Sequence, residues 1–139
     1  MASWDDVRRI AATLPHTEET VRWDNTTWAV ANPRRPSAKP KAYVWERPLR
    51  KRDIDELGPA APGDQPILAV RTADVGVKDA LIADDPAVFF TIPHFNHYPA
   101  VLVLLDAIDT DELEEVMTDA WLTQAPAPVR DEFLATHGE

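Results

Sequence analysis

Apolar residues recur at helical spacing near each end of the chain. Ser3 can cap a first helix and Pro15 can end it; its apolar face is Trp4, Val7, Ile10, Ala11 and Leu14. A longer segment that begins at Asp109 or Thr110 repeats the pattern at Leu113, Val116, Met117, Ala120 and Trp121. These spacings predict two amphipathic helices, and a short last helix is expected after Pro126 and Pro128.

Short runs of β-branched, aromatic and aliphatic residues lie between these helices and predict strands. Six runs have this character: residues 20–23, 26–31, 42–47, 67–71, 88–92 and 100–106. Asp24 and Asn25 predict the turn between the first two runs, and a period of two places Tyr43 and Trp45 on one side of the third. Thr72 is expected to cap a further helix, residues 53–57 fit a single helical turn, and residues 58–66 are expected to form a loop.

This arrangement of elements predicts the fold class. Strands grouped in hairpins, with helices between the groups, indicate an α+β fold whose antiparallel sheet is covered on one face. We expect two layers with about five to six strands, in the order helix, four strands, helix, two strands, helix and a final short helix. The length of 139 residues, without repeats or a linker, predicts a single domain over residues 1–139.

Charge is distributed unevenly along the chain. Residues 34–52 contain eight basic residues and one acid, whereas the remaining 120 residues contain six basic and 23 acidic residues. The net charge of −10 therefore conceals a basic segment attached to an acidic body. Such a concentration of cations is a candidate surface for an anionic partner.

Three interpretations of the basic segment remain open. Its side chains could bind nucleic-acid phosphates, with Tyr43 and Trp45 stacking on unpaired bases. They could equally keep an exposed, proline-rich hairpin solvated, or pair with the acidic helix surface at residues 111–115. The residues expected to contact phosphate are Arg34, Arg35, Lys39, Lys41, Arg50, Lys51 and Arg52.

The chain is rich in tryptophan, with five in 139 residues. Trp4 and Trp121 lie on apolar helix faces and are expected in the core. Aromatic residues on strands could instead line an open sheet face, because an indole N–H needs a partner that water supplies there. The candidate ligand or partner surface consists of Trp23, Trp28, Tyr43, Trp45, His94 and Tyr98.

Residues that commonly carry catalysis are scarce. The chain has no cysteine, its only serines are Ser3 and Ser37, and it has no glycine-rich phosphate loop or nucleophile motif. His94 and His97 lie three residues apart, but too few acids flank them to complete a zinc site. We therefore expect no enzyme activity, no metal and no cofactor. The chain also lacks a signal core and an apolar segment of about 20 residues, which predicts a cytoplasmic protein.

The segment at residues 80–106, ALIADDPAVFFTIPHFNHYPAVLVLLD, carries a distinctive pattern. It combines a helix end, an Asp-Pro break, an aromatic strand, a Pro-His-aromatic turn and a Tyr-Pro-x-Val-Leu-Val strand. This pattern resembles the MmcQ/YjbR family of small bacterial proteins, and LPHTEETVRW at 14–23 and DAWLTQAP at 119–126 match it in the expected places. The sequence departs from the family at His97, where a small residue, often glycine, is expected.

The resemblance implies a two-layer α+β fold of the CyaY-like or secretion-chaperone-like kind. It also implies DNA binding, usually ascribed to a pair of protruding wings, of which residues 34–41 would form one. On this basis we expect a non-catalytic DNA-binding protein that uses the basic hairpin at residues 34–52. The alternative is a module that binds a protein or a small ligand through the aromatic sheet face and the turn at residues 94–98, with no nucleic-acid role.

Overall fold

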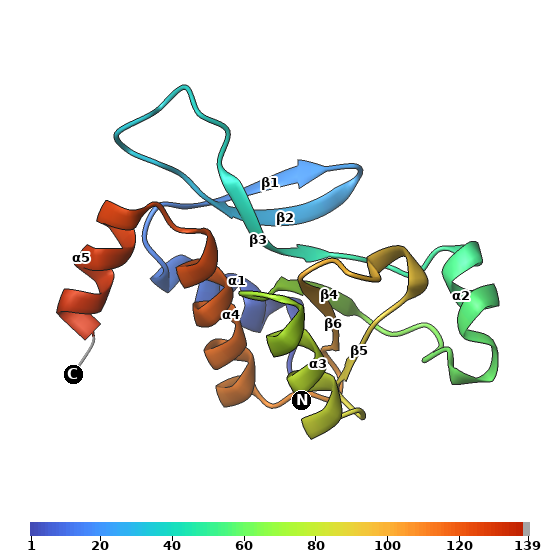
Figure 1. Ribbon diagram of the computed structural model, residues 1–139. Coiled ribbons are helices and arrows are strands. Elements are labelled where there is room, and N and C mark those ends of the chain that lie inside the picture. Colours follow the sequence, from blue (N-terminus) through green and yellow to red (C-terminus); the bar gives the residue numbers. More distant parts are fainter. Residues whose placement is uncertain (138–139) are drawn as a thin grey trace.

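The computed structural model describes residues 1–137, which form five α-helices, six strands and two short 3-10 helices (Figure 1). The helices are α1 (Trp4–Thr13), α2 (Lys51–Leu57), α3 (Val75–Asp84), α4 (Thr110–Gln124) and α5 (Ala127–His137). The strands are β1 (Thr17–Arg22), β2 (Asn25–Val30), β3 (Lys41–Glu46), β4 (Ile67–Arg71), β5 (Phe89–Phe90) and β6 (Ala100–Leu104). The 3-10 helices are η1 (Gly58–Ala60) and η2 (Pro93–Phe95).

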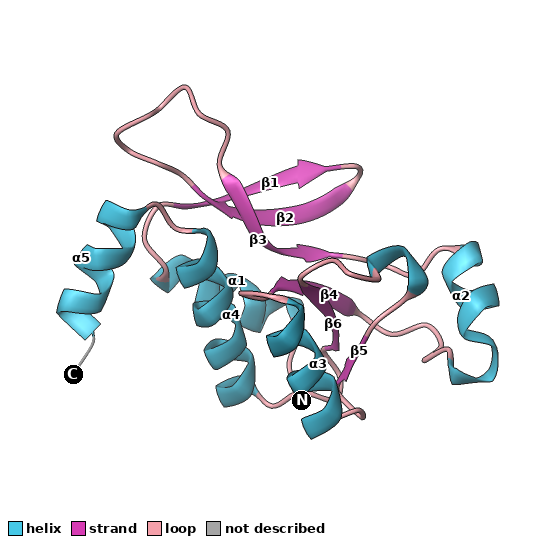
Figure 2. Ribbon diagram, viewed as in Figure 1, coloured by secondary structure: helices cyan, strands magenta, loops and turns pink. Residues whose placement is uncertain are grey.

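The six strands form one open sheet in the order β1-β2-β3-β4-β6-β5, and every neighbouring pair is antiparallel. Figure 2 shows α1 and α4 packed together on one face of this sheet. The predicted α+β class is therefore confirmed. Helix α2, a full helix rather than a single turn, is an addition to the expected order.

The helix-covered face carries the main hydrophobic core. Helix α4 buries the five apolar residues that its spacing predicts. Trp28 of β2 stacks on Trp4 of α1 with ring centroids 6.4 Å apart, and the Trp121 indole donates a hydrogen bond to the Pro15 carbonyl at 3.0 Å. Alternate residues of the central strands, such as Leu68 and Val70 of β4, point into the same core. Packing and paired polar groups therefore close this face to ligands.

The turn of the first hairpin lies one residue earlier than predicted. Its two central residues are Trp23 and Asp24, with φ values of 49° and 63°, and Asn25 is the first residue of β2. Left-handed φ at both positions is the geometry of a type I′ turn, whose twist matches that of the flanking strands. The Asn25 side chain donates to the Trp23 carbonyl at 3.1 Å, which fixes the turn. Trp23 therefore sits at the tip of the hairpin rather than on a strand.

A β-bulge in β3 breaks the predicted alternation of Tyr43 and Trp45. Trp28 pairs with Val44 whereas Ala29 pairs with Ala42, so Tyr43 is an extra residue opposite β2. Tyr43 and Val44 consequently both enter the main core, while Trp45 packs on the opposite face. The expectation that Tyr43 and Trp45 share one face is wrong, because a period of two holds only in a regular strand.

Two helices begin at different residues from those expected. Asp74 rather than Thr72 caps α3: its carboxylate accepts the Val77 N–H at 2.8 Å, and the Thr72 hydroxyl donates to the Asp74 carbonyl at 2.9 Å. Helix α2 begins at Lys51 because the Asp53 carboxylate accepts the backbone N–H of Arg50 at 2.9 Å. Among the described helices, none combines the length and the apolar character that crossing a bilayer requires.

Candidate functional site

The sheet face opposite α1 and α4 carries a second, smaller apolar cluster. Its buried members are Ile67, Ala69, Ile92, Phe95, Ala100 and Leu102. Those on β4 and β6 alternate along the strands with residues of the main core. Leu57 of α2 and the turn at residues 93–98 pack on this cluster, so part of this face is covered by short segments instead of long helices.

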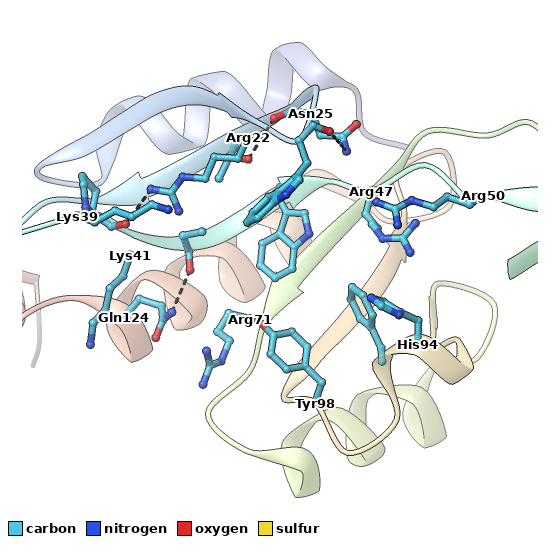
Figure 3. A pocket seen from close by; sticks show the side chains of 16 residues that line it. Arg22, Asn25, Lys39, Lys41, Arg47, Arg50, Arg71, His94, Tyr98 and Gln124 are labelled. Atoms are coloured by element: carbon cyan, nitrogen blue, oxygen red, sulfur yellow. Dashed lines mark hydrogen bonds between the residues drawn. The ribbon is translucent and has the colours of Figure 1, made fainter. Parts of the chain in front are cut away.

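A groove of about 910 Å³ lies beside this cover, and we call it the cationic groove (Figure 3). Its walls come from the β1–β2 hairpin, β3 and its two flanking loops, the end of β4, the turn at 93–98 and the end of α4. Six lining residues are cationic: Arg22, Lys39, Lys41, Arg47, Arg50 and Arg71. None of the described lining residues is acidic. Five of the six make no ion pair among the described residues, and such cations gathered in a concave surface create a positive local field.

Two arginines from separate strands hold the walls of the groove. Arg22, at the end of β1, donates to the Pro40 carbonyl at 2.9 Å and so ties the hairpin to the loop before β3. Arg71, at the end of β4, places its guanidinium 5.8 Å from the centre of the Tyr98 ring. In Figure 3, Lys39 and Lys41 lie toward one end of the groove and Arg47 and Arg50 toward the other. The positive charge therefore extends along the whole groove.

Aromatic rings form a continuous row on the groove wall. The ring centroids of Trp45 and Phe95 are 6.4 Å apart, and those of Phe95 and Tyr98 are 5.5 Å apart in an edge-to-face arrangement. Trp23 and His94 also line the groove. Planar apolar surface and cationic side chains are thus presented to the same ligand volume.

A buried lysine holds the turn that supplies part of this row. Lys78 of α3 is only 3% exposed, and its ammonium donates to the carbonyls of Phe95 at 2.6 Å and Tyr98 at 3.0 Å. Burial lowers the pKa of Lys78, and the nearby Asp79 offsets part of that change. His97 lies in the same turn with a φ of 65°, which explains why a small residue or glycine suits that position.

A buried ion pair anchors the other end of the groove. Arg47 and Asp53 are both buried, and their charged groups are 3.2 Å apart. The Arg47 guanidinium also donates to the Pro48 carbonyl and lies 5.6 Å from the centre of the Phe95 ring. This pairing attaches α2 to β3 and holds the segment that carries Arg50 against the sheet.

Acidic side chains gather elsewhere, where the end of α3 meets the start of α4. Burial raises the pKa of Glu112, and the charges of Asp85, Asp109, Asp84 and Glu115 raise it further. These carboxyl groups therefore form an acidic region at α3, α4 and the ends of these helices, outside the lining of the cationic groove.

The structure divides the predicted basic segment between the two ends of β3. Lys39, Lys41 and Arg50 line the cationic groove; Arg34 and Arg35 lie exposed on the loop between β2 and β3, which Figure 1 shows projecting beyond the sheet. Lys51 and Arg52 are exposed at the start of α2, where Arg52 pairs with Glu56 at 3.5 Å. Within the described chain, the other six predicted phosphate contacts make no ion pair, so the charges of the segment are not paired with the acidic surface of α4.

The predicted aromatic surface is only partly present. Four of its six predicted residues line the same groove: Trp23, Trp45, His94 and Tyr98. Trp28 and Tyr43 do not: they are 1% and 0% exposed in the main core. Including these two in a ligand surface was wrong, because β2 turns Trp28 toward α1 and the bulge turns Tyr43 toward the helices. The Tyr43 hydroxyl is already paired with the Thr17 hydroxyl at 2.9 Å.

Arg47 lies in the charged segment and lines the groove but was not among the expected phosphate contacts, and two further groove cations, Arg22 and Arg71, were missed outside that segment. Each is a single basic residue at the end of a strand, outside the segment where charge is concentrated. The available signal was weak. Arg22 is the last residue of β1 and Arg71 the last residue of β4, and antiparallel pairing brings these two strands near β3. Gln124 was also missed, and its side chain joins α4 to β3 by donating to the Ala42 carbonyl at 3.0 Å.

The groove lining indicates which ligand chemistry it can hold. Among the described residues, no group of three or more histidines and acids is placed to hold a metal ion. The groove instead offers guanidinium and ammonium donors around a row of aromatic rings. Such a surface suits a ligand that has both negative charge and flat unsaturated rings.

Comparison with known proteins finds relatives that are similar in sequence and one solved structure that is similar in fold. Uncharacterised proteins of Mycobacterium tuberculosis and Mycobacterium bovis are 49% identical over 140 aligned residues, covering 99% of this chain and all of theirs. The crystal structure of Deinococcus radiodurans protein DR2400, which carries the DUF419 domain, superposes with a TM-score of 0.64 at 21% identity. That likeness covers 100% of this chain and 83% of the other, and it supports the fold.

The family comparison agrees with these likenesses. The sequence model of the YjbR family matches residues 12–123, from the end of α1 almost to the end of α4. The match includes every strand of the sheet and every lining residue of the cationic groove except Gln124. On the extent of this match and of the mycobacterial likeness, the chain belongs to the YjbR family.

Proposed function

We propose that this protein binds DNA without catalysing a reaction on it, and that the cationic groove is the binding site. The observation that carries the proposal is the set of six cationic residues lining one groove with no acid among the described lining residues. Lysine and arginine are the principal partners of nucleic-acid phosphates, and arginine adds bidentate geometry.

The net charge of −10 does not contradict this proposal. Electrostatic attraction at contact depends on the local field, because salt at physiological strength screens charges beyond about 8 Å. The acidic groups around Glu112 lie on α3 and α4, whereas the groove cations lie on the sheet and its loops. The groove therefore supplies attraction at short range even though the whole molecule is anionic.

The proposal differs from the simple wing hypothesis in where it places the phosphate contacts. Arg34 and Arg35 lie outside the groove lining, on the projecting loop, and Lys39 and Lys41 lie within it. Under our proposal, the loop arginines add non-specific attraction, and the groove cations fix the ligand. Charge-reversal variants at the two places separate these roles.

The test is binding of short DNA at two salt concentrations. Reversal of two exposed groove lysines, Lys39→Glu with Lys41→Glu, is expected to weaken binding at least about tenfold and reduce the salt slope by about 1–2. Arg8→Glu with Arg130→Glu is the matched control, because it changes the net charge equally on α1 and α5, away from the groove. Absence of binding by the unmodified protein at low salt contradicts the proposal.

Two further results of this experiment discriminate among the alternatives. Arg34→Glu with Arg35→Glu is expected to have a smaller effect than the groove pair. If the loop pair abolishes binding while the groove pair leaves it intact, the wing hypothesis is correct and the groove is not the site.

A small anionic ligand is the second candidate. Its supporting observation is size, since 910 Å³ falls within the range of roughly 300–1,000 Å³ typical of small-molecule sites. A thermal-shift screen with nucleotides and aromatic acids tests it, because a ligand that prefers the native state raises the melting temperature. Stabilisation by such a ligand together with no DNA binding supports this candidate over the first.

A further inference from the structure

Trp23 is the most exposed tryptophan that lines the cationic groove. Its side chain is 82% accessible, although burial of an indole normally removes a large apolar surface from water. No ring-stacking or cation–ring partner within the described residues covers it. An uncovered indole at the edge of a cationic groove is a ready stacking surface.

The backbone at Trp23 is itself unfavourable for tryptophan. A φ of 49° lies in the left-handed region, where bulky side chains are rare and where glycine, asparagine and aspartate are favoured. The hairpin would be better served by asparagine at this position, followed by glycine at the next. The chain therefore places a large ring at a strained turn where the fold gains nothing visible from it, which points to a role outside folding.

Stacking on Trp23 requires a flat ring that is not already stacked. Bases in duplex DNA are covered on both sides by their neighbours, whereas bases in a single strand can be splayed onto aromatic side chains. The groove offers further rings at Trp45 and Tyr98, with the cations of Arg22, Arg71 and the two lysines available for the backbone. This combination matches the aromatic platforms and positive grooves of single-strand-binding proteins.

We propose that the cationic groove selects single-stranded over duplex DNA, and that Trp23 determines this selection by stacking on an unpaired base. The inference rests on the proposed DNA-binding function and specifies its substrate. The hairpin tip supplies the stacking surface at the mouth of the groove, and the groove cations hold the phosphates on either side of the stacked base.

The test compares a labelled oligothymidylate of about ten nucleotides with a duplex of the same length, at low salt. The variant Trp23→Asn removes the ring and suits the left-handed turn, so loss of folding does not obscure the result. We expect single-strand affinity to fall roughly tenfold in this variant, with duplex affinity unchanged. The melting temperature of the free protein is expected to rise or stay constant, because the strain is relieved.

Val21→Asn is the matched control. Val21 is 66% exposed on the same hairpin but does not line the groove, so its substitution should leave single-strand affinity intact. The oligonucleotide should also quench tryptophan emission in the unmodified protein, and much of this quenching should disappear in Trp23→Asn.

The outcomes separate this inference from the function on which it rests. Tighter binding of single strands, lost with Trp23→Asn and kept with Val21→Asn, supports both. The stacking inference is overturned, and DNA binding stands, if duplex DNA binds as tightly as single strands. The same conclusion follows if Trp23→Asn binds single strands normally and the Lys39/Lys41 reversal does not. If neither form of DNA binds, both proposals are overturned.

Discussion

The two faces of the sheet carry the same types of aromatic residue in different environments: one face packs them in the core, and the other leaves them exposed beside a groove. On the helix-covered face, Trp28 and Tyr43 are buried, and they are stacked or hydrogen-bonded. On the other face, Trp23 and Tyr98 stay exposed, and the Arg71 guanidinium lies 5.8 Å from the centre of the Tyr98 ring. The difference teaches that aromatic content alone does not identify a candidate binding surface. A strand face can serve as one only where long helices leave it uncovered.

The same contrast applies to charge. Arg47 lines the groove but is neutralised by Asp53, so its charge stabilises the fold and adds little to the local field. Lys39, Lys41 and Arg50 have no ion-pair partner among the described residues. Unmatched cations that fold stability does not require are the groups a ligand can use.

The largest effect expected from this comparison is on stability. Trp28→Ala should lower the free energy of unfolding by about 3–5 kcal/mol, because it opens a cavity beside Trp4 in the main core. Trp23→Asn should change it by less than about 1 kcal/mol, and upward. Urea unfolding monitored by circular dichroism measures both values. Equal losses for the two variants would mean that the faces do not divide folding and binding as we argue.

A smaller effect is expected at the buried ion pair. Asp53→Ala should cost about 3 kcal/mol, since it leaves the buried Arg47 guanidinium without its counter-charge. The double variant Arg47→Met with Asp53→Leu should recover part of that loss, because no buried charge remains, although the Arg50 N–H still loses its acceptor. Chemical unfolding of the three proteins provides the measurement. A double variant as unstable as the single one would show that apolar packing cannot replace this pair.

The smallest expected effect appears at alkaline pH. Burial raises the pKa of Tyr43 to about 12, while its ordinary value is 10.0. Between these values the unfolded chain releases the phenol proton and the native protein keeps it. The free energy of unfolding therefore falls as pH rises through this window, by about 2–3 kcal/mol in total.

The variant Tyr43→Phe isolates this contribution. It should lose less stability than the unmodified protein between about pH 9 and about pH 11, measured by urea unfolding at each pH. The lowered pKa of Lys78 acts in the opposite sense, but it is common to both proteins and cancels in the difference. If the free energies of unfolding of the two proteins change with pH in parallel, the placement of Tyr43 in the main core is contradicted.

The sequence was most informative where one element decides the structure. The apolar spacing of α4 predicts its buried face, and Ser3 caps α1 as its residue type suggests. Prediction failed where two elements interact. The bulge at Tyr43 arises from pairing between β2 and β3, and no property of β3 alone reveals it.

The candidate site shows the same division. The density of charge at residues 34–52 identifies Lys39, Lys41 and Arg50 directly. Arg22 and Arg71 join them only because antiparallel strands bring distant chain segments to one groove. Local patterns therefore locate part of such a site, and the sheet order is needed to complete it.

The charge separation described above has a consequence for how the molecule would meet a polyanion. The electric field of the polymer would turn an anionic protein so that its cationic groove faces the polymer. Encounters would therefore lead to binding only from the side of the groove. Neighbouring copies on the same strand would each carry a net charge of −10. Mutual repulsion would then space them apart, and continuous coating of the polymer would be disfavoured.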